Sequence, residues 1–211
     1  MSNTIIQGLY AITPDLADST LLFGKVEAAL AGGARALQYR NKTADPALRL
    51  EQARGLARLC RGYHVPLIIN DHVDLALEVD AEGLHIGGED GSVADARRRL
   101  GPDRILGVSC YRAIENALAA ARLGATYVAF GGFFPSSVKG GSGGAPLSIL
   151  GEAKRRPGLP VVAIGGITVD NAPQLIAAGA DSISVITALF SAPDVRAAAQ
   201  QFSALFGEKA G

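Results

Sequence analysis

One pattern repeats along the chain: a short apolar or β-branched run, a turn, and then a helical stretch rich in Ala, Leu and Arg. The apolar runs occupy residues 9–12, 36–40, 67–70, 83–86, 105–109, 127–131, 161–165 and 182–187. They follow one another at roughly 20–30 residues, which is the length of one strand–helix unit. Such an alternation leaves two main architectures, an open doubly wound sheet or a closed parallel barrel.

The intervening helices carry recognisable end signals. Helices are expected over 21–31, 46–59, 114–123, 171–178 and 193–206. Asp45 followed by Pro46 is typical of a helix start, and Gly32-Gly33 of a helix end. The helix at 193–206 follows Ala192, so its N-cap is not obvious from the sequence.

The number and even spacing of the apolar runs favour the barrel. No G-x-G-x-x-G opens the first helix, which removes the best marker of a dinucleotide-binding sheet. Glycine pairs follow strand-like runs, among them Gly165-Gly166 after the seventh, where barrels commonly bind phosphate. We therefore expect an α/β fold, one parallel (β/α)8 TIM barrel, with residues 1–211 forming a single domain.

Composition narrows the class of protein. The formal net charge is zero with 19% charged residues, so a nucleic-acid partner is not expected. Two widely spaced cysteines, Cys60 and Cys110, indicate reduced thiols in a cytoplasmic protein. The N-terminus lacks the features of a signal peptide, and no apolar run has the length of a membrane span, so no membrane partner is expected.

Polar side chains stand at the ends of the predicted strands, where a parallel barrel brings them together. The second run ends Gln38-Tyr39-Arg40-Asn41-Lys42, and two cations beside an amide suit a phosphate-bearing ligand. The alternative is a solvated turn. The fifth run ends at Ser109, which can hydrogen-bond a ligand but has no nearby partner to activate it as a nucleophile.

Two carboxylates end neighbouring runs and suggest a metal site. Asn70-Asp71 ends the third run, and Asp90 follows the fourth. Mg²⁺ takes oxygen ligands, often one or two carboxylates together with substrate phosphates. The alternative is that either aspartate caps the next helix. His85 lies within the fourth run and is expected to line the barrel rather than bind metal.

The remaining strand ends point to a second anion. The loop after the sixth run carries Ser136, Ser137, Val138 and Lys139 within a glycine-rich stretch, which is typical of a lid over an anion. Backbone N–H groups at Gly165-Gly166 can cradle a phosphate monoester. The eighth run ends Ile186-Thr187 beside them, so the two neighbouring runs form the usual barrel phosphate site.

Taken together, these segments resemble the thiamine phosphate synthase family over nearly the full chain. The matching segments are Leu9 to Thr13, Gln38 to Lys42, Ile69-Asn70-Asp71, Gly83 to Gly87 with Glu89-Asp90, Gly107-Val108-Ser109, Phe130-Gly131 with Phe134-Pro135, Lys139, and Ala163 to Ile167. Several occur singly in other barrels, but their order and combination are specific.

The resemblance implies a transferase. It would couple 4-amino-2-methyl-5-hydroxymethylpyrimidine diphosphate to a carboxylated or plain hydroxyethylthiazole phosphate, releasing diphosphate and thiamine phosphate. It also implies Mg²⁺ as cofactor, held by Asp71 and Asp90. The implied catalytic residues are Arg40, Lys42, Ser109 and Lys139. The partners would be small phosphorylated molecules, and a homo-oligomer stays open.

The resemblance also assigns the two substrates. By this resemblance, the residues that bind the pyrimidine diphosphate are Gln38, Tyr39, Arg40, Asn41, Lys42, Asn70, Ser109 and Lys139. Those that bind the thiazole phosphate are Ser136, Ser137, Val138, Gly165, Gly166, Ile186 and Thr187. The chain departs from the family's pattern at three places, where Gly88 replaces a usual Gln, Val138 a usual Thr and Ile186-Thr187 a usual Val-Ser.

Three other functions remain alternatives. A thiazole tautomerase of the same fold would not need the set formed by Arg40, Lys42, Asp71 and Asp90. A sugar-phosphate epimerase is another phosphate-handling barrel. A catalytically silent phosphate-binding barrel is compatible with Gly88 and Val138.

Overall fold

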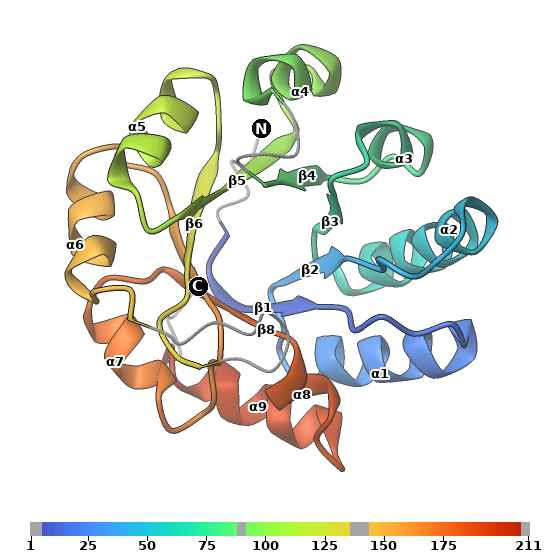
Figure 1. Cartoon of the computed structure of the whole chain (residues 1–211). Helices are drawn as coiled ribbons and strands as arrows, with labels where there is room; N and C mark the ends of the chain where they lie inside the picture. The colour runs from blue at the N-terminus through green and yellow to red at the C-terminus, as the bar shows by residue number, and fades with distance from the viewer. Residues whose placement is uncertain (1–5, 88–91, 136–143, 208–211) are drawn as a thin grey trace.

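The computed structural model describes residues 6–87, 92–135 and 144–207. Within these residues the strands form a closed parallel barrel in the order β1 to β8, and β8 returns to pair with β1. Figure 1 looks into the ring of strands and shows the helices arranged around its outside. The predicted (β/α)8 TIM barrel is confirmed.

Strand bounds agree with the apolar runs to within one residue, except that β5 extends two residues beyond the predicted end at Ser109 and β8 ends two residues early. The strands are β1 (Gly8–Ile12), β2 (Ala36–Tyr39), β3 (Leu67–Asn70), β4 (Gly83–Ile86), β5 (Ile105–Tyr111), β6 (Tyr127–Gly131), β7 (Val161–Ile164) and β8 (Ser182–Val185). The helices are α1 (Ser19–Ala31), α2 (Pro46–Tyr63), α3 (Val73–Glu78), α4 (Val93–Leu100), α5 (Ile114–Arg122), α6 (Ser148–Arg155), α7 (Ala172–Ala177), α8 (Thr187–Phe190) and α9 (Val195–Ala204).

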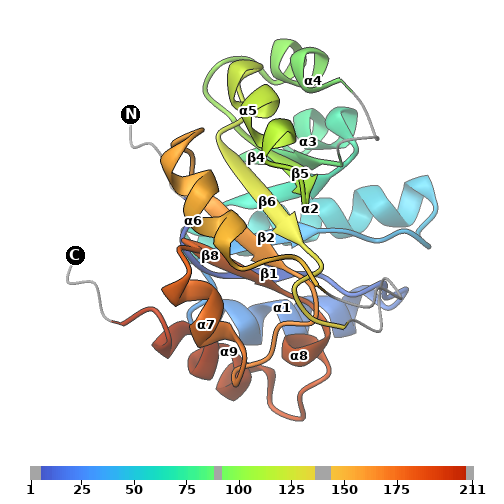
Figure 2. The same cartoon turned by 60° about the vertical axis from the view of Figure 1, so that its left-hand side comes forward.

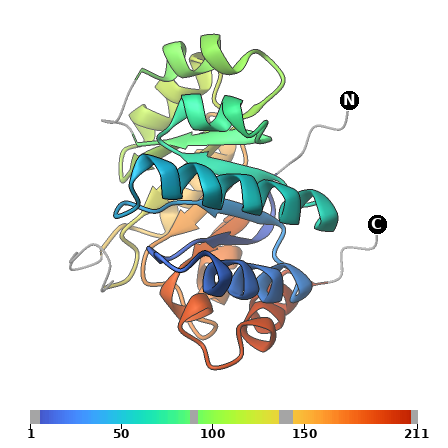
Figure 3. The ribbon, with the colours of Figure 1, turned by 90° about the vertical axis from the view of Figure 1, so that its right-hand side faces the viewer.

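Helix starts follow local capping chemistry. The Asp45 carboxylate accepts the N–H of Leu48, and Pro46 occupies the first turn of α2, as the sequence predicted. The start predicted for the last helix was wrong by two residues, because Asp194 caps α9 by accepting the N–H of Ala197. Figures 2 and 3 show α9 beside α1, which closes the outer ring.

The eighth strand is shorter than predicted. It ends at Val185, and the backbone of Ile186 leaves the extended conformation. The chain then forms the short helix α8, in which the N–H of Phe190 donates to the carbonyl of Ile186 at 2.9 Å. A turn of helix at the strand end uses backbone groups that β8 would otherwise leave unpaired.

Two apolar layers hold the fold. The larger layer lies between strands and helices and includes Leu9, Leu37, Leu56 and Phe202. The smaller fills the barrel interior with residues from alternate strand positions, as side chains of a parallel barrel do. Its members are Ile6, Tyr10, Ala36, Ile68, Ile105, Tyr127, Ala129 and Val162.

No helix in the described part of the chain combines the length and apolarity that crossing a membrane requires.

Candidate active site at the strand ends

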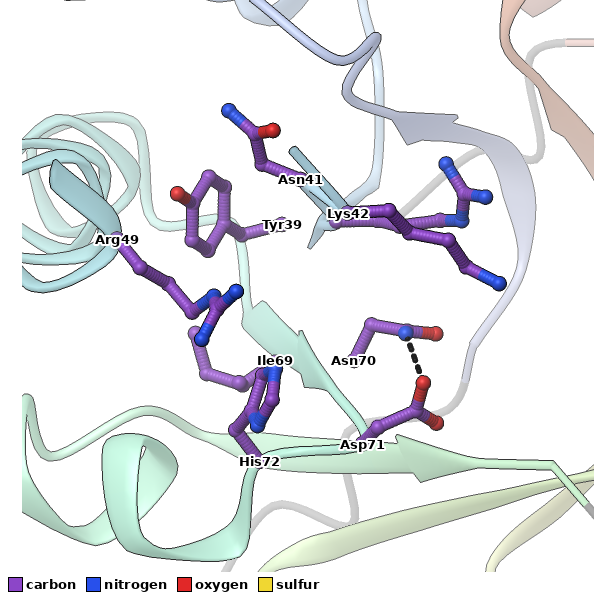
Figure 4. Close-up of a pocket in the computed structure, with 9 residues that line it drawn as sticks. Tyr39, Asn41, Lys42, Arg49, Ile69, Asn70, Asp71 and His72 are labelled. Atoms are coloured by element: carbon purple, nitrogen blue, oxygen red, sulfur yellow. Dashed lines mark hydrogen bonds between the residues drawn. The ribbon is translucent and has the colours of Figure 1, made fainter. Parts of the chain in front are cut away.

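Two adjoining cavities open where the strands end. The first measures about 260 Å³ and lies between the ends of β2 and β3 and the first turn of α2 (Figure 4). The second measures about 100 Å³ and lies over the barrel interior. Four polar residues line both cavities: Arg40, Lys42, Asn70 and Asp71. The structure thus brings together the predicted side chains of the second and third strands.

The backbone of Arg40 is fixed by Thr13, which follows β1. The Arg40 N–H donates to the Thr13 hydroxyl at 2.9 Å, and this hydroxyl donates to the Arg40 carbonyl at 2.8 Å. Asp15 adds an ion pair of 3.2 Å with the Arg40 guanidinium and accepts the N–H of Lys42 at 2.9 Å. The loop after β1 therefore positions both cations at the cavity.

Asn41 lies between the two cations but its side chain serves the loop. The amide donates to the Leu16 carbonyl at 2.8 Å and to Gln52 of α2 at 3.0 Å. Its oxygen accepts the N–H groups of Thr43 and Ala44 at 3.2 and 3.1 Å. With its side chain occupied in this way, Asn41 has its backbone to offer a ligand.

Tyr39 also turns toward α2. Its hydroxyl donates to Gln52 at 2.8 Å, and burial raises the pKa of Tyr39 well above its usual range. A neutral phenol with a short internal hydrogen bond is a structural group. The ring of Tyr39 forms part of the wall of the first cavity.

Asn70 and Asp71 form a pair at the end of β3. The Asn70 amide donates to one oxygen of the Asp71 carboxylate at 2.6 Å (Figure 4). Asp71 has a left-handed backbone, with φ of 62°, which aspartate tolerates better than most residues. Its N–H donates to the His85 carbonyl at 2.9 Å, which ties this corner to β4.

The first cavity has a further basic wall that the sequence did not single out. Arg49 of α2 donates to the Ala44 carbonyl at 2.7 Å, while its Nε is buried without a hydrogen-bond partner among the described residues. His72 lines the same cavity on the side of Arg49 (Figure 4). Burial, together with the positive charge of Arg49, lowers the pKa of His72. His72 is therefore mainly neutral at pH 7, and the positive charge on this wall belongs to Arg49.

Polar residues of the barrel interior form the floor of the second cavity. The Ser109 hydroxyl lies 2.9 Å from the His85 Nε2. The His85 Nδ1 lies 2.9 Å from the Tyr127 hydroxyl. His85 therefore lines the barrel, as the sequence indicated, and connects Ser109 to deeper groups.

The ends of β7 and β8 present a different surface. Gly165 and Gly166 have φ values of 107° and 64°, which favour glycine. A Cβ at Gly166 would stand 2.3 Å from the Pro135 carbonyl oxygen, so the loops after β6 and β7 touch through backbone atoms. Ile186 lines the second cavity, and Thr187 is exposed at the start of α8.

The donor set at Asp71 suits a hard cation. Asn70 engages one carboxylate oxygen, which orients the group and leaves the other for an ion. Within the described residues no group of three His, Cys, Asp or Glu side chains gathers as a metal site. A metal here would therefore depend on oxygen atoms of the substrate and on the predicted second ligand, Asp90.

Several predicted site residues lie outside the described residues. They are Asp90, Ser136, Ser137, Val138 and Lys139, together with the variant position Gly88. Conversely, four residues at or beneath the cavities were not predicted as site residues from the sequence: Tyr10, Asp15, Arg49 and Tyr127. Asp15 follows β1 by three residues, so the rule used for the other strand ends would have found it. Arg49 gave no such signal, because it lies within α2.

Comparison with known proteins agrees with this geometry. The profile of the family described as thiamine monophosphate synthase matches residues 9–189. A thiamine-phosphate synthase of Nitrosomonas eutropha is 52% identical over 206 residues, covering 98% of this chain and 97% of the relative. One of Methylobacillus flagellatus is 54% identical over 201 residues, covering 95% and 96%.

A solved structure supports the same relationship. The thiamine phosphate pyrophosphorylase from Pyrococcus furiosus superposes with a TM-score of 0.85 and 36% identity, covering 99% of this chain and 98% of that one. Sequence and structure thus agree over nearly the whole length. The chain belongs to the thiamine monophosphate synthase family.

Proposed function

We propose that the chain is a transferase of thiamine biosynthesis that couples an aminopyrimidinylmethyl diphosphate to hydroxyethylthiazole phosphate. The bond from the pyrimidinylmethyl carbon to the diphosphate oxygen breaks, and diphosphate leaves with the electron pair. The thiazole nitrogen then forms the new C–N bond at that carbon. No proton has to be removed for this coupling, so no general base is required. The observation that best supports this proposal is that Arg40 and Lys42 line both cavities at the strand ends.

Negative charge develops on the leaving diphosphate. Arg40 and Lys42, which line both cavities, stabilise that charge where it forms, an electrostatic role that preorganised cations fill well. Asp15 and Thr13 hold the two residues in place before substrate arrives. Asn70 and Ser109 contact the pyrimidine diphosphate, with Lys139 as a third predicted contact.

The second substrate binds on the opposite side of the mouth. Backbone groups of Gly165 and Gly166 bind the phosphate of the thiazole, with Ile186 and Thr187 beside them. Ser136, Ser137 and Val138 complete this set in the proposal. The thiazole phosphate keeps its charge through the reaction, so neutral backbone donors suffice.

Mg²⁺ fits the proposal as cofactor. Asp71, oriented by Asn70, and Asp90 would hold the ion, which when bound supplies positive charge that neutralises the diphosphate.

A cytoplasmic location also belongs to the proposal. Cys60 and Cys110 are both buried free thiols, which suit a reducing compartment.

The test is a coupling assay with purified protein, both phosphorylated substrates and Mg²⁺. Equimolar diphosphate and thiamine phosphate are expected, and leaving out the thiazole phosphate abolishes thiamine phosphate formation. Absence of product at saturating concentrations of both substrates would overturn the proposal. An Asp71→Ala variant should lose turnover while keeping its circular dichroism spectrum, and unchanged turnover would remove Asp71 from the metal site.

A further inference from the structure

Five polar side chains form a continuous hydrogen-bonded row through the barrel interior. The Gln38 Nε2 lies 3.0 Å from the Tyr10 hydroxyl, which lies 2.9 Å from the Tyr127 hydroxyl. From Tyr127 the row continues to His85 Nδ1 at 2.9 Å and from His85 Nε2 to Ser109 at 2.9 Å. These residues, which we call the interior row, come from β2, β1, β6, β4 and β5 and cross the barrel from one wall to the other.

The row is built into the fold. Tyr10 and Tyr127 are fully buried, with ring centroids 6.0 Å apart in an edge-on arrangement. The His85 and Tyr127 rings stack at 5.6 Å. Gly107 makes room for this, because a Cβ there would stand 2.0 Å from the Tyr127 ring. Both ends of the row, Gln38 and Ser109, line the second cavity.

Counting hydrogens gives the row a direction. Burial raises the pKa of Tyr10 and of Tyr127 well above their usual range, so each phenol keeps one hydrogen to donate. Because the Gln38 amide donates to Tyr10, the Tyr10 hydrogen goes to Tyr127. The Tyr127 hydrogen then goes to His85 Nδ1, which must accept.

The direction continues to the cavity. With Nδ1 accepting, neutral His85 carries its hydrogen on Nε2 and donates it to the Ser109 oxygen. The Ser109 hydrogen is then directed away from His85, toward the second cavity, which Ser109 lines. At the other end, the Gln38 amide spends one of its two N–H groups on Tyr10, which fixes the orientation of the amide. Its oxygen remains as an acceptor, with the second N–H beside it.

We propose that the interior row makes Ser109 a hydrogen-bond donor and Gln38 an acceptor toward the ligand, with Tyr10, Tyr127 and His85 as positioning residues. This inference rests on the proposed function. The pattern selects an aminopyrimidine, whose ring nitrogen can accept from Ser109 and whose exocyclic amine can donate to Gln38. An oxopyrimidine diphosphate presents an acceptor in place of the amine and leaves the Gln38 oxygen opposed to another oxygen. An unmatched polar pair of this kind costs affinity.

The direct test is the tautomer of His85, read by long-range ¹H–¹⁵N spectra of the ligand-free protein at pH 7.5. Signals of the three histidines are assigned with His64→Gln and His72→Gln variants. Protonation at Nε2 alone is expected for His85. Protonation at Nδ1 alone, or at both nitrogens, would overturn the proposal. This result does not depend on catalysis, so it stands apart from failure of the coupling reaction.

Two variants test whether Gln38 sets the direction. In Gln38→Glu an ionised carboxylate only accepts, so the row should reverse and move the His85 hydrogen to Nδ1. Tyr39→Phe is the control: it removes a buried hydroxyl on the same strand, whose hydrogen bond to Gln52 lies outside the interior row. The tautomer of His85 should not change in this variant. An unchanged tautomer in Gln38→Glu, or a change in Tyr39→Phe, would contradict the role of Gln38.

Kinetics tests whether Tyr127 acts through Ser109. Tyr127→Phe should lower kcat/KM for the pyrimidine diphosphate about 10-fold, the worth of one well-made hydrogen bond, without changing KM for the thiazole phosphate. Tyr127→Phe should also reduce the preference for the aminopyrimidine over the oxopyrimidine diphosphate. When Tyr127→Phe is added to Ser109→Ala, kcat/KM should fall no further than in Ser109→Ala alone. Additive losses in the double variant would show that Tyr127 acts independently of Ser109 and would overturn the positioning role.

Discussion

The two sides of the barrel mouth are built in different ways. The side formed by β2 and β3 presents Arg40, Lys42 and Asp71, which are charged side chains held by neighbouring loops. The side formed by β7 and β8 presents Gly165 and Gly166, where backbone atoms and close loop contact replace side chains. We call these the charged side and the glycine side.

The difference matches what each side has to do in the proposed reaction. A departing diphosphate gains negative charge in the transition state, so charges aimed at it accelerate the reaction. A phosphate monoester that does not react needs only uniform binding, which backbone donors provide. Substitutions on the charged side should therefore affect kcat, and those on the glycine side mainly KM.

The largest effect is expected from Arg40→Ala. Loss of a cation aimed at the leaving group should lower kcat about 10²–10³-fold, as removal of one electrostatic stabiliser does in other enzymes. Arg54→Ala is the matched control, since Arg54 forms an exposed ion pair with Glu78 on the outer face of α2. Steady-state kinetics with the pyrimidine diphosphate as variable substrate checks this. Equal losses in the two variants would remove Arg40 from the reaction.

The floor beneath both sides should be intolerant of added volume. A Cβ at Gly107 would overlap the Tyr127 ring, so Gly107→Ala should lower the free energy of unfolding by about 1–3 kcal/mol, the usual cost of overpacking a core. At Gly62, near the end of α2, a Cβ meets nothing within 4 Å, and Gly62→Ala should be neutral or stabilising. Urea unfolding of both variants distinguishes these cases, and equal stability would argue against the packing described for Tyr127.

A smaller effect is expected on the glycine side. Gly166→Ala brings a Cβ against the Pro135 carbonyl, so the backbone that binds the phosphate has to move. KM for the thiazole phosphate should rise about 10-fold, the loss of one hydrogen bond, with kcat little changed. Gly158 shares the left-handed backbone, with φ of 69°, but has open space around it, so Gly158→Ala controls for strain alone. A larger fall in kcat than rise in KM for Gly166→Ala would place this residue in the chemical step.

The smallest effect is expected from thiol modification. Cys110 follows Ser109 on β5 but is buried outside the cavity, and burial raises the pKa of Cys110 and of Cys60 to about 12. Since the thiolate is the reactive form, both should resist iodoacetamide at pH 8 in the folded protein and react after unfolding. Mass spectrometry of the native protein gives the result, and rapid modification of Cys110 would contradict its placement.

Much of the fold could be predicted because the strands and five of the helices are signalled locally. The run at 67–70 and the Asp45-Pro46 start of α2 are examples, and both match the structure. The end of β8 was mispredicted because Ile186 and Thr187 have the β-branched character of a strand. Their short helix depends on backbone bonds that composition does not reveal.

The candidate site was predictable only where polar residues end strands. Arg40, Lys42, Asn70 and Asp71 were found this way, and the structure places them at shared cavities. Tyr10 and Tyr127 were passed over because tyrosine within a strand fits an apolar core equally well. Their hydrogen bond joins residues 117 positions apart, a pairing that depends on closure of the barrel.

Simultaneous occupation of the two sides is the most direct test of the proposed coupling. Calorimetric titration of inorganic diphosphate with Mg²⁺ into protein already saturated with hydroxyethylthiazole phosphate measures it. One equivalent of diphosphate is expected to bind without displacing the thiazole phosphate, and Arg40→Ala should weaken only this diphosphate step. Displacement of the thiazole phosphate by diphosphate would show a single shared anion site and contradict the division into a charged side and a glycine side.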